Sequence, residues 1–555
     1  MNNYKMFERD IYNINYYISN SEYLLLKEKY MNLFNTLFLK LLYYRYYKLY
    51  KNLYNIIKKK NNDFINHRIK TCELLNNING YALDKEQKTS VINDEDNILI
   101  LAGAGSGKSL TLIGKIRYLI EEKNINENEI LCISFTNESA VSLKNNIMKN
   151  YNYDIDVFTF HKLSLEIIKY FENDINIAPS NYLEYIVDEI LSNDYINCSD
   201  FYIKNYLKNN IVTFINLFKS SGYKYEYFNE IILKNNKVKN KVIRKKNLIL
   251  INIIKYFYLI YENELHSQKM IDFNDMITYS EYLVRKNGIN KEYKYILIDE
   301  FQDTSFIRFK LIDSVRKCCD SKVVAVGDDF QSIYRFTGCN LDIFLNFEKY
   351  FGYTSIISIK NTYRNSNELI KVAGDFIMKN NSQIKKDLSS NKSNKKPIKI
   401  FYYNEEKELY KLINYIVKKY GENILVISRN NNDIIPYLSD KLKYEDNYLI
   451  TSNLKIKYLT AHKSKGLEEE NTILINLTNK SLGFPSKITN NKILDLVLSK
   501  DDNYPYSEER RLFYVALTRT KNNVFLFVKK NEESIFVKEL ISNSSRYIEF
   551  LDKLL

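Results

Sequence analysis

Short apolar runs alternate with longer amphipathic stretches along most of the chain, in two successive series. The first series lies at residues 98–101, 130–135, 295–298 and 322–327, and the second lies at residues 398–400, 424–427, 458–460, 472–475 and 524–527. Apolar runs of this length, separated by helical patterns, are typical of parallel strands that helices cover on both faces. The pattern therefore predicts an α/β fold with two sheet-containing domains that face one another across a cleft.

Three segments fall outside this alternation. Residues 1–80 repeat apolar and aromatic side chains at a helical period, which predicts an amphipathic helical extension that packs on the body of the protein. Its apolar face would consist of Leu26, Tyr30, Leu33, Phe34, Leu37, Leu41 and Tyr44. Contact of this Tyr-rich, basic segment with nucleic acid is the weaker alternative. Residues 165–270 predict a helical insertion, and the polar residues 385–396 predict an exposed loop.

A glycine-rich loop follows the first apolar run. The chain has 14 glycines, and those at positions 103, 105 and 107 directly precede Lys108 and Ser109. Glycines let backbone N–H groups turn inward around a phosphate, the lysine adds charge near the β- and γ-phosphates, and the serine hydroxyl can bind Mg²⁺. The predicted loop consists of Ala102, Gly103, Ala104, Gly105, Ser106, Gly107, Lys108 and Ser109. The sequence therefore predicts binding of a nucleoside triphosphate with Mg²⁺.

Composition adds limits on partners and location. The formal net charge of +14 favours a polyanionic partner, although a lysine-rich surface that serves only solubility is an equally common cause. The six cysteines show no paired or metal-ligand spacing, so neither a disulfide framework nor a zinc site is indicated. No apolar stretch is long enough to span a membrane, and the N-terminus lacks a secretory signal. We therefore expect a cytoplasmic protein without a membrane partner.

Two adjacent carboxylates end the third apolar run. Asp299 and Glu300 follow residues 295–298, and Asp299 lies 191 residues after Lys108. Triphosphate hydrolysis needs one carboxylate in the shell of the metal and a second that orients the attacking water. Paired acids at a strand end are more often plain surface residues, but here they follow a phosphate-binding loop. We therefore interpret Asp299 as the metal-shell residue and Glu300 as the water-orienting residue.

Further motifs follow one another in a recognisable order. They are Leu83–Gln87, the glycine-rich loop, Phe135–Asn137, Thr159–His161, Asp299–Thr304, Val326–Tyr334, Thr362–Arg364, Thr460–Glu468 and Glu508–Arg519. In this order they resemble superfamily 1 DNA helicases of the UvrD/Rep type, over residues 83 to about 527. Residues 335–336, residues 483–486 and the short interval between Arg364 and Thr460 resemble the helicase IV subgroup most.

The resemblance implies two RecA-like P-loop domains with parallel sheets. The first, which binds ATP, would comprise residues 81–164 and 271–360, interrupted by the helical insertion subdomain at residues 165–270. The second, with a reduced insertion of its own, would comprise residues 361–555. Residues 1–80 would be an N-terminal helical extension.

In the ATP site, the resemblance assigns the recognition of the nucleoside to three residues. Gln87 would hydrogen-bond the edge of the adenine, Tyr363 would stack on its face, and Glu468 would contact the ribose.

The resemblance also assigns the residues that act on the phosphates. Gln331 of the first domain would sense the γ-phosphate, while Arg364 and Arg519 of the second domain would act as arginine fingers. The predicted catalytic residues are Lys108, Asp299, Glu300, Gln331, Arg364 and Arg519.

For single-stranded DNA, the resemblance implies stacking platforms that tolerate any base sequence. The predicted DNA-binding residues are Phe135, His161, Tyr334, Phe336 and His462. Ordinary core packing is the alternative for the aromatic residues, because 14% of the chain is aromatic.

Together these features predict an ATP-dependent DNA helicase that moves 3′ to 5′ on single-stranded DNA and unwinds tailed duplex DNA, in repair or recombination. One alternative is a DNA-dependent ATPase that remodels or recycles RNA polymerase. Another is a catalytically inactive DNA-binding scaffold, against which the intact predicted catalytic residues argue. Other DNA-repair proteins or RNA polymerase are the protein partners that these hypotheses imply.

Overall fold

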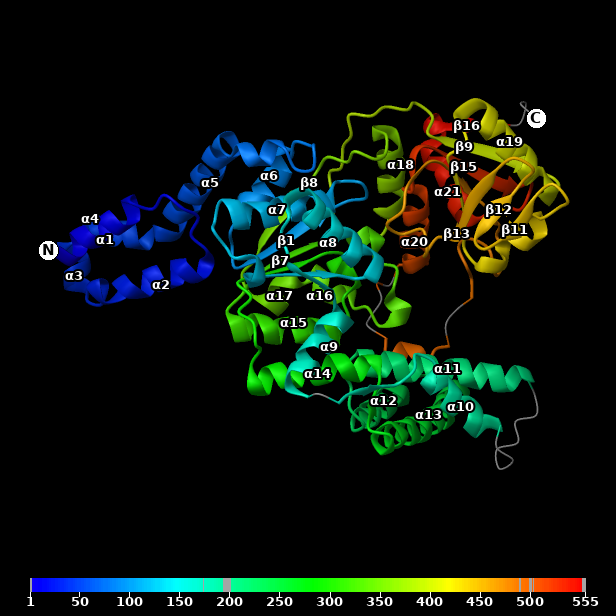
Figure 1. The fold of residues 1–555 in the computed structure, drawn as a ribbon, viewed down its shortest axis with the longest axis horizontal. Helices are drawn as coiled ribbons and strands as arrows, with labels where there is room; N and C mark the ends of the chain where they lie inside the picture. The colour runs from blue at the N-terminus through cyan, green and yellow to red at the C-terminus, as the bar shows by residue number, and fades with distance from the viewer. Residues whose placement is uncertain are drawn as a thin grey trace.

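A six-stranded sheet with helices on both faces forms the first half of the body (Figure 1). The computed structural model describes residues 2–172, 174–192, 201–488, 491–498, 502 and 504–551. Every neighbouring pair of strands in this sheet is parallel, in the order β3-β2-β6-β7-β1-β8. The strands are β1 (Asn97–Ala102), β2 (Ile130–Ser134), β3 (Asp156–Thr159), β6 (Tyr295–Ile298), β7 (Lys322–Gly327) and β8 (Ser355–Ile359).

Alternating side chains of the central strands explain the two helix layers. In β1, Ile98 and Ile100 are buried in one core with α7 (Lys108–Glu121). Leu99 and Leu101 are buried in the other core with α14 (Phe273–Asn287) and α15 (Phe306–Cys319). A strand that is apolar at every position is stable only between two covering layers, so the predicted α/β fold is confirmed. The helices of this half are α6 (Lys85–Ile92), α7 (Lys108–Glu121), α8 (Asn137–Tyr151), α9 (Phe160–Phe171), α14 (Phe273–Asn287), α15 (Phe306–Cys319), α16 (Leu341–Leu345) and α17 (Phe347–Phe351).

An eight-stranded sheet forms the second half, in the order β11-β12-β13-β10-β14-β15-β9-β16. Its pairs are parallel except at one edge, where β11 and β12 form an antiparallel hairpin that also runs antiparallel to β13. The hairpin turns at Asp446 and Asn447, both with positive φ, a two-residue turn signal that the apolar pattern alone did not identify. The strands are β9 (Ile398–Tyr403), β10 (Ile424–Ser428), β11 (Lys443–Glu445), β12 (Tyr448–Ile450), β13 (Lys455–Thr460), β14 (Glu469–Leu474), β15 (Thr520–Lys529) and β16 (Ile548–Phe550), and the helices are α18 (Asn367–Ile377), α19 (Leu409–Tyr420), α20 (Ser507–Leu517) and α21 (Ile535–Ser544).

Four helices between α9 and α14 build a separate core below the two sheets in Figure 1. They are α10 (Tyr182–Ser192), α11 (Phe201–Ser220), α12 (Tyr227–Asn236) and α13 (Lys241–Ser267), and the chain enters and leaves them through the paired strands β4 (Asn176–Ile177) and β5 (Met270–Ile271). Ile493, Leu494 and Val497 complete this core from a segment more than 200 residues further along the chain. The helical insertion is therefore tied to the second half of the molecule by apolar packing.

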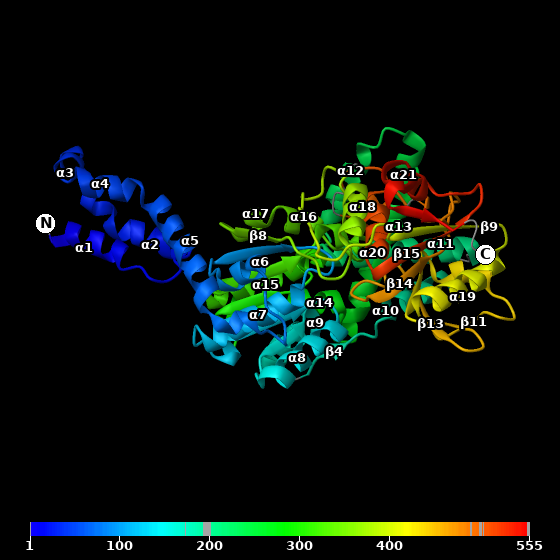
Figure 2. The ribbon, with the colours of Figure 1, turned by 90° about the horizontal axis from the view of Figure 1, so that it is seen from above.

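The N-terminal helices project from the body and carry their own small core (Figures 1 and 2). They are α1 (Asn2–Tyr12), α2 (Asn20–Met31), α3 (Leu37–Leu42), α4 (Tyr44–Lys51) and α5 (Leu53–Thr71). The prediction of one continuous apolar face packed on the body is wrong for most of this segment. Thr36 caps a new helix, so Tyr30 and Phe34 are buried while Leu37 and Leu41 are exposed. In the described part of the chain, every helix is too short or too polar to cross a lipid bilayer.

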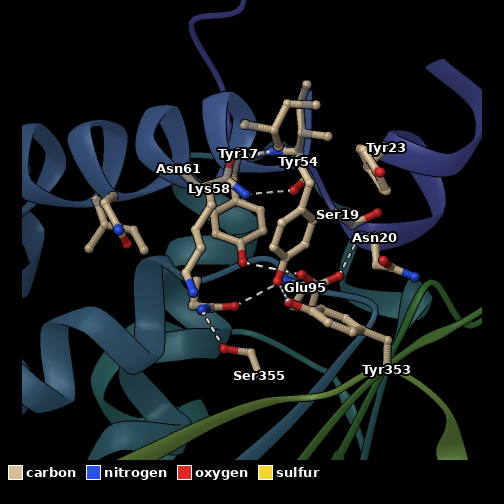
Figure 3. A pocket seen from close by; sticks show the side chains of 15 residues that line it. Tyr17, Ser19, Asn20, Tyr23, Tyr54, Lys58, Asn61, Glu95, Tyr353 and Ser355 are labelled. Carbon is tan, nitrogen blue, oxygen red and sulfur yellow. Dashed lines mark hydrogen bonds between the residues drawn. The ribbon is translucent and has the colours of Figure 1, made fainter. Parts of the chain in front are cut away.

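The extension is attached to the body through a small polar junction around Glu95 (Figure 3). The buried Glu95 carboxylate accepts hydrogen bonds from the backbone N–H of Asn20 (2.6 Å) and from the hydroxyl of Tyr17 (3.3 Å). Burial raises the pKa of Glu95 above its usual range. Beside it, the hydroxyls of Tyr54 and Tyr353 form a hydrogen bond of 3.3 Å. Both tyrosines line a cavity of about 160 Å³. Apolar packing adds to these hydrogen bonds, because Tyr17, Ile65 and Leu75 are buried in the core that β1 shares with α7.

The separate core of the extension leads to a stability prediction for Phe7. This side chain is fully buried among the N-terminal helices, so Phe7→Ala should destabilise the extension by about 3–5 kcal/mol. We expect hydrogen exchange to accelerate in the N-terminal helices while the ATPase rate of the body is unchanged. Phe38→Ala is the matched control, because Phe38 is 71% exposed. Equal exchange rates in both variants would show that the extension does not depend on this core.

Candidate functional site

The predicted motifs meet at one edge of the first sheet. The glycine-rich loop follows β1, Asp299 and Glu300 follow β6, Gln331 follows β7, and residues 362–364 follow β8. All these strands are parallel, so their carboxyl ends lie at the same edge, where α/β proteins bind their ligands. The topology thus gathers residues that are more than 250 positions apart in the sequence, such as Ala104 and Thr362.

The glycine-rich loop has the backbone conformation that a phosphate cradle needs. Gly105 and Gly107 have φ values of 71° and 77°, a left-handed conformation that side chains disfavour. Gly107 is the N-cap of α7, so the first turn of α7 presents N–H groups and the positive end of the helix dipole to an anion. Ser109 lies exposed in this first turn. The loop can therefore bind phosphate groups before any side chain contributes.

Lys108 and the two carboxylates form a charged group beside the loop. The Nζ of Lys108 lies 3.1 Å from Oε1 of Glu300. Burial and the charge of Glu300 raise the pKa of Asp299 to about 6. Burial alone would raise the pKa of Glu300 as well, but the charges of Lys108 and Lys465 lower it to about 2. The two lysines therefore favour the ionised form of Glu300, whereas burial and the charge of Glu300 disfavour ionisation of Asp299.

Two arginines from the second half of the molecule reach this edge. Arg519 follows α20 and is 1% exposed, and its Nη2 donates a hydrogen bond to Oε1 of Gln331 (3.2 Å). Arg364 binds Glu468 through its Nε at 2.6 Å. Burial and the charge of Arg364 lower the pKa of Arg519 to about 9. The two guanidinium groups therefore repel one another, and an anion bound beside them would stabilise both.

The loop after β8 packs directly on the glycine-rich loop. The Thr362 hydroxyl donates to the oxygen of Ala104 at 2.7 Å, and the Tyr363 N–H donates to the oxygen of Gly105 at 2.9 Å. The Tyr363 ring is 48% exposed, and its hydroxyl donates to Asp84 at 2.9 Å. This ring is therefore open on the side where a base could stack.

Gln87 is less open than its predicted role suggests. Its side chain is fully buried; Nε2 donates to the oxygen of Ser106 (3.0 Å), and Oε1 accepts from the N–H of Asp84 (2.9 Å). Its amide therefore supports the glycine-rich loop, and hydrogen bonding to a base would require these bonds to be exchanged.

Lys465 is a site residue that sequence reasoning missed. Its side chain is 8% exposed and forms an ion pair with Asp303. Its Nζ also donates a hydrogen bond to the backbone oxygen of Gln331 at 2.8 Å. It also lies 3.9 Å from Glu300. Its position inside the motif Thr460–Glu468 was the available signal, but only the structure shows that it reaches the carboxylates of the first domain.

Four of the five predicted DNA-binding residues form one aromatic cluster between the two halves. The rings of Phe135 and Tyr334 lie 5.6 Å apart and nearly parallel, and those of Phe336 and His462 meet edge to face at 5.3 Å. The Tyr334 hydroxyl donates to the oxygen of His462 at 3.2 Å. Phe336 is exposed and the other three are partly exposed. The cluster therefore offers stacking faces from both sheet domains.

His161 lies beside this cluster rather than in it. Its ring meets Phe273 edge to face at 5.4 Å, and burial together with the charge of Arg308 lowers the pKa of His161 to about 4. Burial and the charges of Arg429 and Lys465 lower the pKa of His462 likewise to about 4. Both histidines are therefore neutral near pH 7 and can contribute ring faces but no charge.

Arg308 and Phe273 are further residues that sequence reasoning missed. The Arg308 guanidinium lies 4.8 Å from the centre of the Phe135 ring, and Phe273 is 41% exposed next to His161. Neither belongs to a motif that the sequence made visible, so only the tertiary contacts identify them.

Comparison with known proteins agrees with this arrangement. The UvrD/REP helicase N-terminal domain matches residues 83–352, and the UvrD-like helicase C-terminal domain matches residues 439–531. DNA helicase IV of Escherichia coli is 26% identical over 509 residues, which are 85% of this chain and 72% of that protein. The ATP-dependent DNA helicase Rep of Buchnera aphidicola is 29% identical over 504 residues, which are 84% and 72% of the two chains. The two domain matches together span more than half of the chain, which therefore belongs to the UvrD/Rep family of ATP-dependent DNA helicases.

Proposed function

We propose that this helicase uses ATP hydrolysis to move 3′ to 5′ along single-stranded DNA and to unwind tailed duplex DNA, in repair or recombination. The observation that carries the mechanism is the contact of Arg519 with Gln331, because it joins the two sheet domains at the predicted position of the γ-phosphate. A nucleotide bound there would draw the domains together, and hydrolysis would let them separate. Polarity and setting rest on the family resemblance.

Lys108 and the backbone of Ala102–Ser109 would bind the phosphates of ATP, and Ser109 and Asp299 would hold Mg²⁺. A hydroxyl and a carboxylate are the hard oxygen donors that Mg²⁺ takes. No group of three or more His, Cys, Asp or Glu side chains that could hold a metal occurs among the described residues. This fits an ion held by one or two side chains together with substrate phosphates. When bound, Mg²⁺ would neutralise charge that develops on the phosphates.

The remaining site residues divide between recognition and catalysis. Tyr363 would stack on the adenine, Gln87 would support its recognition, and Glu468 would contact the ribose after releasing Arg364. Glu300 would orient the attacking water, because the charges of Lys108 and Lys465 favour its ionised form. Gln331 would meet the γ-phosphate, and Arg364 and Arg519 would stabilise the charge of the transition state.

The aromatic cluster would stack successive bases of single-stranded DNA, which predicts a loss of affinity in Phe135→Ala. Stacking contributes about 1–3 kcal/mol per base, so the dissociation constant for oligo-dT should rise by about an order of magnitude. Fluorescence anisotropy with labelled oligo-dT measures the change. Phe550→Ala is the matched control, because Phe550 is exposed at the edge of the second sheet. An unchanged affinity in Phe135→Ala would assign this ring to packing alone.

Unwinding of 3′-tailed against 5′-tailed duplexes tests the proposal as a whole. We expect ATP-dependent strand separation on the 3′-tailed substrate only, with an ATPase rate that rises when oligo-dT is added. Preference for the 5′ tail would overturn the polarity, and an ATPase rate indifferent to DNA would overturn translocation.

A further inference from the structure

The loop between α18 and β9 reaches from the second sheet domain to the first at the ATP site. Most of residues 385–396 are exposed, as their polarity predicts, but part of the loop is buried. We call residues 384–392 the strap. Lys386 is the clearest departure, since its side chain is only 2% exposed. The strap contacts three parts of the site: Asp329 through the N–H of Ile384 (2.8 Å), Gly103 through the side chain of Leu388, and the backbone oxygen of Arg364 through Nζ of Lys392 (3.3 Å).

Two adjacent buried carboxylates face the ammonium of Lys386. Its Nζ forms ion pairs with Asp328 and Asp329, whose side chains are fully buried, and lies 3.8 Å above the Phe330 ring. Burial lowers the pKa of Lys386, but the two carboxylates raise it above its usual value, so the ammonium is charged. Without it, two buried carboxylates would face one another with no cation between them, and their present arrangement would be strongly destabilised.

Asp328 in turn determines which way the Gln331 amide points. The Nε2 of Gln331 donates to Oδ2 of Asp328 at 2.7 Å, and its Oε1 accepts from Arg519 at 3.2 Å. The Asp328 carboxylate also accepts a hydrogen bond from the backbone N–H of Phe330 at 3.2 Å, which fixes its position. Because its Oδ2 accepts from the NH₂ group of Gln331, the oxygen of the amide points to Arg519.

We propose that Lys386 is a positioning residue for ATP hydrolysis: its ion pair holds the Asp328 carboxylate in place, and that carboxylate holds the Gln331 amide in the orientation that meets Arg519. This inference rests on the proposed roles of Gln331 and Arg519. Lys386 belongs to a loop of the second sheet domain and Asp328 follows β7 of the first, so a domain movement that lifts the strap would release the amide. The orientation of the Gln331 amide therefore depends on whether the strap lies against the first sheet domain.

Lys386→Met tests this inference through the steady-state kinetics of the full-length protein with oligo-dT. Loss of a residue that supports a reacting group typically costs about 10–100-fold in activity, and we expect kcat to fall by that amount while the KM for ATP stays close to its original value. Lys386→Arg keeps the charge and should recover most of kcat. Lys385→Met makes the same chemical change at the exposed neighbouring position and should leave kcat unchanged.

Asp329→Asn separates positioning from a purely structural role. It perturbs the same ion cluster but keeps the contacts of Lys386 with Asp328 and of Asp328 with Gln331. We expect its melting temperature to fall while kcat is retained.

If Lys386→Met does not fold, the double variant Lys386→Met/Asp329→Asn restores the net charge of the cluster, and its kcat should still be low. An unchanged kcat in either Lys386→Met or the double variant, or an equal loss in Asp329→Asn, overturns the inference.

Gln331→Ala and Arg519→Ala distinguish this inference from the proposed function. If both variants keep the kcat of the unchanged protein, the roles assigned to Gln331 and Arg519 are wrong, and the inference fails with them. If both lose kcat while Lys386→Met does not, the assigned roles stand and only the role of Lys386 is overturned.

Discussion

Replacing Arg519 by alanine is expected to lower the DNA-stimulated turnover of ATP by about 10³-fold or more, with little change in the KM for ATP. The guanidinium is fixed before any nucleotide arrives: its Nε donates to the oxygen of Val515 at 2.9 Å and its Nη1 to the oxygen of Leu467 at 3.3 Å. A buried charge that is already oriented needs no reorganisation when negative charge develops on the transferring phosphate. Steady-state ATPase assays with oligo-dT measure both constants.

The control for Arg519 is Arg546→Ala, which removes an exposed arginine from the same domain. It should leave kcat and KM as they are. Arg519→Lys separates charge from geometry, because lysine keeps one positive charge but cannot make all the directed contacts of the guanidinium. We expect Arg519→Lys to remain strongly impaired. Turnover close to that of the unchanged protein in Arg519→Ala would mean that Arg519 only joins the two domains.

Replacing Lys108 by alanine is expected to lower ATP turnover by about 10²–10³-fold and to weaken ATP binding as well. The ammonium lies beside the glycine-rich loop and 3.1 Å from Glu300, so its removal takes positive charge from the phosphates and from the water-orienting carboxylate together. The pKa of Glu300 should rise when that charge is lost, because the remaining influence of burial favours the protonated acid. Turnover and the dissociation constant of a fluorescent ATP analogue give the two effects separately.

Lys149→Ala is the control for Lys108, since Lys149 lies exposed near the end of α8 and has no part in the site. Thermal melting of both variants checks that the loss is not one of folding. If Lys108→Ala bound and hydrolysed ATP at the original rate, the glycine-rich loop would not be the ATP site, and the remaining assignments around it would lose their reference point.

The two variants, Lys108→Ala and Arg519→Ala, also distinguish ATP binding from ATP turnover. Lys108 belongs to the first sheet domain and would act on nucleotide bound there, whereas Arg519 comes from the second and would act only when the domains are together. We therefore expect Lys108→Ala to lose affinity and turnover, but Arg519→Ala to lose turnover alone. This difference is the kinetic signature of an ATP site shared across a domain boundary.

The sequence by itself determined the elements that depend on local pattern. The apolar runs at 98–101 and 322–327 became buried parallel strands, because a run apolar at every position has no stable place except between two helix layers. The glycine-rich loop was equally visible, because left-handed backbone at Gly105 and Gly107 requires residues without a side chain. The order of motifs identified the family, since each motif keeps its residues close together in the sequence.

Only the tertiary structure decided what depends on which distant segments meet. It showed that Ile493 completes the core of the helical insertion, that the N-terminal helices carry their own core, that Gln87 is already occupied by Asp84 and Ser106, and that Lys386 is buried. Burial of a charged lysine is unfavourable on its own, and nothing in this polar loop predicts it. It becomes stable only because two buried carboxylates face the ammonium. Hydrogen-bond partners and desolvation belong to the assembled fold, and no local pattern in the chain records them.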